Sequence, residues 1–315
     1  MNLQGLDRRG LWVAIGAFLL WGVMPLWWHM MKSVPSFQIV LHRIAWSAVI
    51  VGGYLVLRDG RGWLRAALSK PRAAWMLAIS GILIGFNWGL YIWAVNAGHV
   101  VETSLGYFIN PLLNVLLGVM FLRERLGRAQ WVSVAVATIG VAWLTVRFGH
   151  PPYIALALAA SFALYGFIRK LVPVDSIPGL GVEGAYLLLP VVVMLAWIEL
   201  HGQGGFFQSV SAGGFGLWMS VLLIVSGGLT ALPLVGFSYA VRRVPLSVIG
   251  LLQYIAPTLQ FLLGIFAFHE AFDRDRAIGF AFIWLALAIF AIDGFLRARR
   301  APARPAPLSP APATR

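Results

Sequence analysis

The sequence predicts an all-α integral membrane protein in which ten transmembrane helices form two inverted-topology five-helix repeats around a central cavity. Three observations predict this fold class. First, 60% of the 315 residues are hydrophobic and 11% are charged, whereas soluble domains carry about 25% charged residues. Second, apolar stretches long enough to cross a bilayer recur along the chain. Third, the two halves of the sequence resemble each other.

The predicted helices follow from apolar stretches that are separated by short polar or Gly/Pro-containing breaks. A membrane-spanning helix needs about 20 apolar residues, so each stretch predicts one span. The first five stretches cover residues 10–30, 37–57, 73–96, 101–122 and 129–146. The second five cover residues 153–170, 181–200, 216–240, 246–268 and 277–296.

These stretches divide the chain into three parts. We expect a first five-helix repeat over residues 1–148 and a second over residues 149–297. Residues 298–315 form a predicted disordered tail, since this segment consists almost entirely of Ala, Pro, Arg, Ser and Thr and cannot bury enough apolar surface to fold.

The distribution of Lys and Arg predicts the orientation. With the N-terminus inside, 19 of the 24 basic residues lie in segments on the inner side, four lie outside and Arg43 lies within a span. The positive-inside rule then places both termini in the cytoplasm. The net charge of +13 is thus explained by topology, and a nucleic-acid partner is not expected.

An internal repeat appears when the chain is shifted against itself by 146 residues. This offset aligns residues 91–128 with residues 237–274 and brings Pro111 over Pro257 and Glu124 over Glu270. A repeat unit of five helices is odd, so the second copy enters the bilayer in the opposite orientation. Inverted repeats are typical of secondary transporters, whose binding site lies between the halves.

Two equivalent helices carry polar stripes. In the fourth, the spacing of three and four residues places Tyr107, Asn110, Pro111, Asn114 and Gly118 on one face. In the ninth, the offset carries these positions onto Gln253, Ala256, Pro257, Gln260 and Gly264. We expect the stripes to face each other across a substrate cavity, with a helix break at each proline. The alternative is that the amides hold helices together.

Charged residues within the spans are candidates for function because they are costly in a membrane. Arg43 is expected to face the cavity and to bind an anionic group, with Glu102 as its partner; a fixed structural ion pair is equally compatible. Glu183 is a candidate for proton coupling, although pairing with Arg169 and Lys170 is favoured. Glu124 and Glu270 are expected to be gate or capping groups.

Tryptophan positions suggest two environments. Trp27 and Trp28, with other residues near helix ends, are expected to anchor the protein at the membrane interface. Four deeper residues are candidates for an apolar cavity wall: Trp21, Trp46, Trp88 and Trp93.

Specific motifs resemble the RarD branch of the EamA-type transporters. They include Asn87-Trp88-Gly89-Leu90-Tyr91, Ser104-Leu105-Gly106-Tyr107-Phe108-Ile109-Asn110-Pro111, Tyr165-Gly166-Phe167 and Leu252-Gln253-Tyr254-Ile255-Ala256-Pro257. The resemblance implies the drug/metabolite transporter superfamily, with ten helices in two inverted halves around a cavity. Within these motifs, Asn87, Tyr91 and Tyr165 are further candidates for the cavity.

The leading functional prediction is a secondary active transporter that exports a small organic metabolite or drug across the bacterial inner membrane. A proton or a counter-substrate is the expected coupling partner, and a homodimer is left open. The alternatives are an integral membrane enzyme acting on lipid and a sensor or pore. No cofactor or metal is predicted, because the chain contains no cysteine and no GxxxxGK[ST] motif for a nucleotide.

Overall fold

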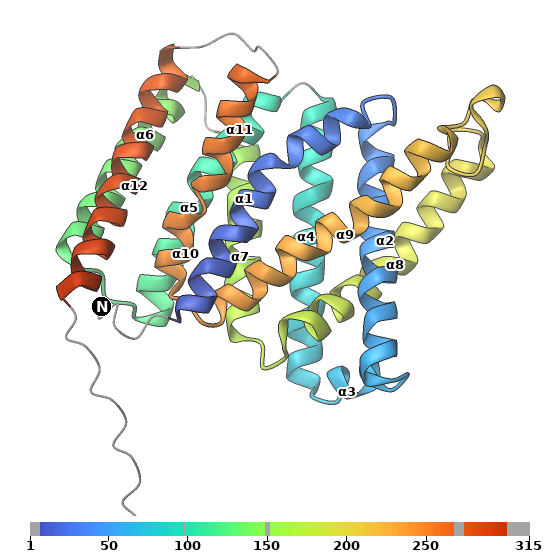
Figure 1. Cartoon of the computed structure of the whole chain (residues 1–315), viewed down its shortest axis with the longest axis horizontal. Helices are drawn as coiled ribbons and strands as arrows, with labels where there is room; N and C mark the ends of the chain where they lie inside the picture. The colour runs from blue at the N-terminus through green and yellow to red at the C-terminus, as the bar shows by residue number, and fades with distance from the viewer. Residues whose placement is uncertain (1–6, 98, 149–151, 268–273, 301–315) are drawn as a thin grey trace, which may run out of the picture.

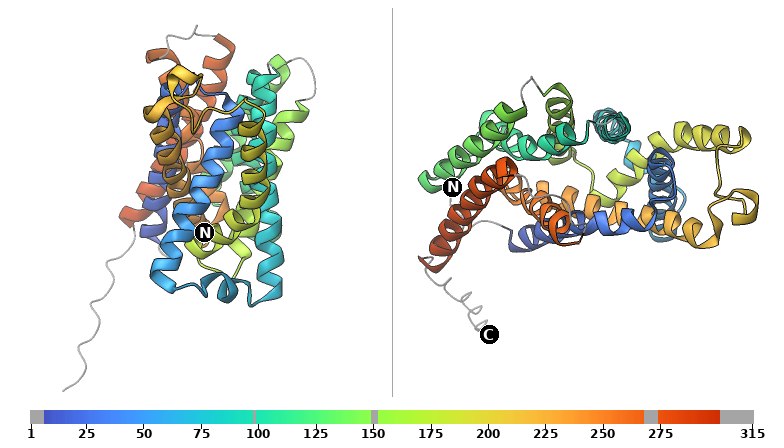
Figure 2. Two further views of the ribbon diagram at one scale, coloured as in Figure 1. Left: turned by 90° about the vertical axis from the view of Figure 1, so that its right-hand side faces the viewer. Right: turned by 90° about the horizontal axis from the view of Figure 1, so that it is seen from above.

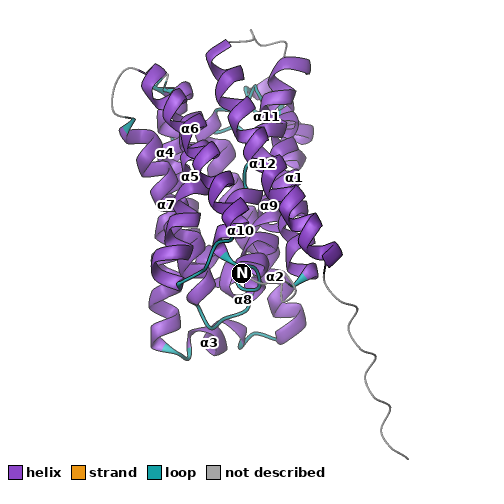
Figure 3. Ribbon diagram, turned by 90° about the vertical axis from the view of Figure 1, so that its left-hand side faces the viewer, coloured by secondary structure: helices purple, strands orange, loops and turns teal. Residues whose placement is uncertain are grey.

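The computed structural model describes residues 7–97, 99–148, 152–267 and 274–300. All regular secondary structure in these residues is helical, as Figure 3 shows. Eight helices are long and apolar enough to cross a membrane, and two shorter apolar segments cover Leu246–Gln260 and Ala277–Asp293. The prediction of an all-α membrane protein is therefore confirmed.

The helices of the first half begin and end within a few residues of the predicted spans. They are α1 (Arg8–Met30), α2 (Ser36–Asp59), α3 (Trp63–Leu68), α4 (Pro71–Asn96), α5 (Val100–Leu122) and α6 (Arg128–Phe148). The short helix α3 was not predicted, because its six residues are too few to form a membrane span. Asp7 caps α1 by accepting hydrogen bonds from the N–H groups of Arg9 and Gly10.

The second half contains α7 (Tyr153–Leu171), α8 (Ser176–Leu200), the 3₁₀ helix η2 (Val210–Ala212), α9 (Gly216–Val241), α10 (Leu246–Leu252), α11 (Ile255–Phe266) and α12 (Arg274–Arg300). The ninth predicted span is thus two helices. The interruption at Gln253 and Tyr254 precedes Pro257, which lacks the N–H needed to bond the carbonyl four residues earlier. By contrast, α5 continues through Pro111, so the expected symmetric break is present in the second half alone.

The helices pack in two rows that meet at both edges (Figure 2). One row contains α1, α9 and α11, and the other contains α4, α5 and α7. At one edge α6 packs against α12, and at the other α2 packs against α8 and α9 (Figure 1). We call the end where α1 begins and α12 ends the terminal end, and the opposite end, where α1 leads into α2, the distal end.

Two glycines allow close contacts between helices. A Cβ atom on Gly22 would lie 2.6 Å from the side chain of Leu259, and one on Gly250 would lie 2.5 Å from the carbonyl oxygen of Pro111. Because glycine has no side chain, α1 can approach α11 and α10 can approach α5 at these points. The contact at Gly250 brings the two predicted polar stripes together.

Candidate functional site

A cavity of about 330 Å³ lies between the two rows. Its lining comes from seven of the spans and includes Phe18, Trp21, Met24, Pro25, Trp28, Ser36, Ile39, Val40, Arg43, Asn87, Trp88, Tyr91, Thr103, Gly106, Tyr107, Asn110, Leu158, Phe162, Leu234, Gln253, Ala256, Pro257 and Gln260. Both halves of the chain contribute, so the cavity exists only in the folded bundle.

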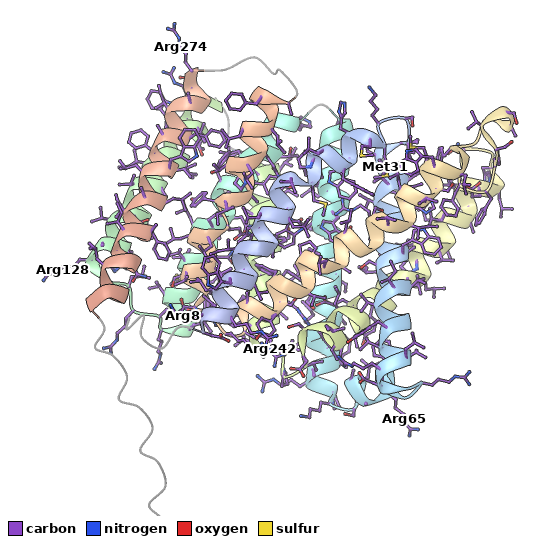
Figure 4. All side chains as sticks on the ribbon, in the orientation of Figure 1. Arg8, Met31, Arg65, Arg128, Arg242 and Arg274 are labelled. Atoms are coloured by element: carbon purple, nitrogen blue, oxygen red, sulfur yellow. The ribbon has the colours of Figure 1, made fainter. Side chains whose placement is uncertain are left out.

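The cavity lies mainly in the distal half of the bundle. It is lined by the second half of α1, by the beginning of α2 and by the beginning of α5. Figure 4 shows Arg8, Arg65 and Arg242 at the terminal end and Met31 at the distal end. The site is therefore displaced away from the termini.

Arg43 lies in the cavity wall between two indole rings. Its guanidinium carbon lies 4.3 Å from the ring centroid of Trp28 and 5.4 Å from that of Trp88. Its Nε donates a hydrogen bond of 2.9 Å to Oγ1 of Thr230 on α9. Cation–π contacts of this kind stabilise a charge that is removed from bulk water.

Two tyrosines and two amides complete the polar wall. The rings of Tyr91 and Tyr107 have centroids 6.0 Å apart, and Tyr107 is 42% exposed because it borders the cavity. Asn87 Nδ2 donates to the Leu158 carbonyl at 2.8 Å, and the Gln260 amide donates to the Trp21 carbonyl at 3.2 Å. These amides join helices and line the cavity at the same time.

The two polar stripes contact each other on the terminal side of the cavity. Asn114 Nδ2 donates a 2.6 Å hydrogen bond to Oε1 of Gln253, which joins α5 to the interruption between α10 and α11. Asn110 and Gln253 line the cavity, whereas Asn114 is buried beyond it. The stripe thus serves both predicted roles: its distal part borders the cavity and its terminal part is a helix contact.

An aromatic floor closes the cavity toward the terminal end. It consists of Phe18, Trp21, Phe162, Tyr165 and Phe237, whose neighbouring rings have centroids 5.3–6.2 Å apart. Tyr165 is a predicted residue of the cavity wall, but it is fully buried, stacks on Phe237 within the floor and does not line the cavity. Ring stacking of this kind fills the space between helices with little room for water.

A buried ion pair lies behind the aromatic floor. Arg169 Nε lies 3.6 Å from Glu183 Oε1, and both side chains are at most 1% exposed. Ser80 donates to Glu183 at 2.5 Å, the Tyr165 hydroxyl lies 3.4 Å from Glu183, and Ser238 accepts from Arg169 Nε at 3.1 Å. Hydrogen bonds are what make such a buried pair tolerable.

Glu124 and Lys170 form a contact at the terminal end. The two Glu124 oxygens accept hydrogen bonds from the backbone N–H groups of Leu246 and Ser247, so Glu124 caps α10 from the loop between α5 and α6. Lys170 Nζ lies 4.0 Å from Glu124 and donates to the carbonyls of Val241 and Val244. Lys170 therefore joins Glu124 instead of Glu183.

Several predicted residues lie elsewhere. Trp46 packs beside Phe206 and Trp93 is largely exposed, so neither lines the cavity. The side chain of Glu102, the surroundings of Gly264 and the whole of Glu270 lie outside the described residues.

Sequence reasoning missed Thr230, Ser80 and Ser238, and it treated Trp28 as an interfacial anchor. A small polar residue inside an apolar span is the weak signal that these positions offered.

Comparisons with known proteins identify the family. The EamA-like transporter family matches residues 8–146. A protein RarD of Streptomyces exfoliatus is 43% identical, covering 96% of this chain and 95% of that protein. The chain belongs to the RarD branch of the EamA family. Another relative, the uncharacterized transporter YojE of Bacillus subtilis, is 41% identical over 90% of this chain and 93% of its own.

A more distant relative agrees with this assignment, and a solved structure shares the fold. A chloramphenicol-sensitive protein RarD of Pseudomonas aeruginosa is 32% identical, covering 93% of this chain and 96% of that protein. A crystal structure of a protein has the same fold, with a TM-score of 0.65 and 23% identity over 93% of this chain and 99% of that chain.

EamA membership confirms the predicted family and the general prediction of a membrane transporter. The names of the relatives and the apolar helices together describe a multi-pass protein of the bacterial inner membrane that acts on a small molecule. They point to a transporter rather than to an enzyme.

Proposed function

We propose that this protein is a secondary active transporter that exports a small organic metabolite or drug by alternating access. The observation that carries the proposal is the one-sided cavity: it is lined by both halves of the chain, and the aromatic floor and the Asn114–Gln253 hydrogen bond close it toward the terminal end. A site at the interface of two halves that is closed on one side is what alternating access requires.

The helix contacts support a division into two inverted repeats over residues 1–148 and 149–297. If α1, α2, α4, α5 and α6 correspond to α7, α8, α9, α10–α11 and α12, the most extensive contacts have counterparts. The α5–α7 contact then corresponds to the α11–α1 contact, and the α4–α7 contact corresponds to the α9–α1 contact. Three further contacts correspond to themselves: α2–α8, α5–α10 and α6–α12. Because these contacts are preserved when the helices of one half are exchanged for those of the other, the pattern favours ten transmembrane helices related by pseudo-symmetry.

The basic residues favour a cytoplasmic terminal end. Arg8, Arg65 and Arg242 lie there (Figure 4), in agreement with the positive-inside rule. The structure then corresponds to an outward-facing state, in which the aromatic floor, the Arg169–Glu183 pair and the Glu124–Lys170 contact form successive layers of an inner gate.

Coupling would involve the inner gate. Glu183 is the carboxylate nearest to the cavity floor in the described part of the chain, and a proton or a counter-substrate would shift the balance between its contacts to Arg169 and Tyr165. The described lining of the cavity comes from one chain, so the proposal does not require a homodimer.

Flux through proteoliposomes tests the proposal. The purified full chain would be reconstituted and supplied with a panel of metabolites and antibiotics, including chloramphenicol because the name of one relative mentions it. We expect flux that responds to an imposed proton gradient or to counter-substrate. Asn110→Ala should reduce flux, whereas Thr138→Ala, an exposed position on α6, should leave it unchanged. Absence of flux for the whole panel would contradict the proposal.

A further inference from the structure

We infer that the cavity selects organic anions through Arg43: the transported molecule carries a carboxylate on a small aromatic or apolar body. The inference rests on the proposed transport function and names the chemical class that the same cavity accepts.

The described lining of the cavity carries one unbalanced positive charge. Arg43 is the only formally charged residue among the described residues that line it. Among the described side chains, no carboxylate forms an ion pair with Arg43. A charge within a membrane span is costly and is retained mainly where it has a structural or functional role. A site that retains such a charge and faces a cavity is suited to an anion that enters with its own apolar body.

Contacts with three residues hold the guanidinium group of Arg43 in position. Thr230 holds Nε, and the faces of Trp28 and Trp88 restrict the plane of the group. In the described structure its hydrogen bond to the protein uses Nε, which leaves the two Nη groups for a ligand. Paired N–H groups in a fixed plane match the two oxygens of a carboxylate, and arginine provides this geometry where lysine does not.

The rest of the wall defines the body of the ligand. A volume of about 330 Å³ is at the lower end of small-molecule sites, which range over about 300–1,000 Å³. Aromatic rings surround this volume, including those of Trp21, Tyr107 and Phe162. A compact aromatic or apolar group therefore fits, and the single positive charge disfavours organic cations.

Three probes with similar bodies and different head groups test the inference. Phenylacetate, phenylacetamide and phenethylammonium would be titrated against the purified full chain in lipid nanodiscs, with thermal shift and calorimetry as readouts. We expect phenylacetate to bind at least about tenfold more tightly than phenylacetamide, which corresponds to about 1.4 kcal/mol. The ammonium probe should bind most weakly.

Variants assign the preference to Arg43. Arg43→Gln should abolish the difference between phenylacetate and phenylacetamide, and Arg43→Lys should retain a reduced difference because the charge remains. The matched control is Arg147→Gln: Arg147 also lies over an indole ring, that of Trp143 at 4.7 Å, but outside the cavity. This variant should keep the preference of the parent protein.

Several results would overturn the inference. They are equal affinity for the carboxylate and the amide, tighter binding of the ammonium probe, binding of none of the probes by the folded parent, or a preference that persists in Arg43→Gln. Equal affinities are also expected if Glu102 neutralises Arg43 permanently. If Arg43→Gln does not fold, the comparison of the probes on the parent protein and on Arg43→Lys still tests the inference.

Flux measurements separate this inference from the proposed function. Gradient-dependent flux of neutral or cationic compounds, without any preference for anions, would overturn the inference and leave the transport proposal intact. Binding of phenylacetate through Arg43 without flux of any compound would support the inference and contradict the transport proposal.

Discussion

At the residue scale, the charges within the spans occupy two kinds of environment. Arg169 and Glu183 are buried against each other, and the hydroxyl groups of Ser80 and Ser238 hydrogen-bond to Glu183 and Arg169 respectively. Arg43 instead faces a cavity and rests on aromatic rings. The first arrangement pairs the two charges inside the protein, whereas the second leaves a positive charge available to a ligand.

The buried pair leads to a stability prediction. Glu183→Leu removes one partner and leaves Arg169 as an uncompensated charge, so we expect a loss of about 3–5 kcal/mol. The double variant Arg169→Met/Glu183→Leu should regain most of this loss because no buried charge remains. Thermal unfolding in detergent measures both effects.

An exposed pair provides the control for this experiment. Arg58 and Asp59 form an ion pair at the end of α2 with both side chains more than a third exposed, and the equivalent double substitution should change stability little. If the double variant at Arg169 and Glu183 folds, its response to a proton gradient shows whether the pair takes part in coupling. A double variant as unstable as Glu183→Leu would contradict the prediction.

At the element scale, the two equivalent helices with a central proline behave differently. The backbone of α5 remains helical through Pro111, while the second copy divides into α10 and α11 before Pro257. The short α10 depends on a cap from elsewhere, since Glu124 at the end of α5 bonds its first backbone N–H groups. One half of the chain thus completes a helix of the other half at the terminal end.

This cap leads to a prediction about the inner gate. Glu124→Ala should lower stability by about 0.5–2 kcal/mol, the usual cost of removing a helix cap. It should also increase labelling of an Ala256→Cys reporter in the cavity by a reagent applied from the terminal side, since the contact to Lys170 is lost as well.

The control is Glu199→Ala at the distal end. Glu199 likewise accepts hydrogen bonds from two backbone N–H groups, those of Gly205 and Phe206. We expect a comparable loss of stability and unchanged labelling from the terminal side. Equal labelling in the two variants would show that Glu124 is a cap without a role in the gate.

At the scale of the whole molecule, the two halves interleave instead of forming separate domains. The helices α1 and α7 each pack mainly against helices of the other half, and the cavity lies where these contacts meet. Separating the halves would therefore expose the site. This arrangement explains why the cavity forms only when the two halves pack together.

The orientation of the whole molecule can be tested by chemical labelling. The natural chain contains no cysteine, so single substitutions need no prior engineering. Ser69→Cys at the terminal end should react only after the membrane is permeabilised, and Ser209→Cys at the distal end should react in intact cells. Both positions are exposed, so accessibility within the protein does not bias the comparison. The reverse pattern would invert the proposed orientation.

Much of the architecture follows from the sequence, because the cost of placing polar groups in lipid acts on each segment separately. Apolar length determined where the helices lie, and the family motifs determined the transporter class. Arg43 was identifiable for the same reason, since a single charge in an apolar stretch is costly wherever the helix packs.

Only the tertiary structure decided which side chains share a site. Thr230 supports Arg43 from 187 residues away, Tyr165 lies behind the cavity rather than in its wall, and α5 passes through its proline unbroken. These outcomes depend on how helices from the two halves face each other. Between helices, contact is decided by packing and by the angle of each face, and hydropathy along one segment contains no information about either.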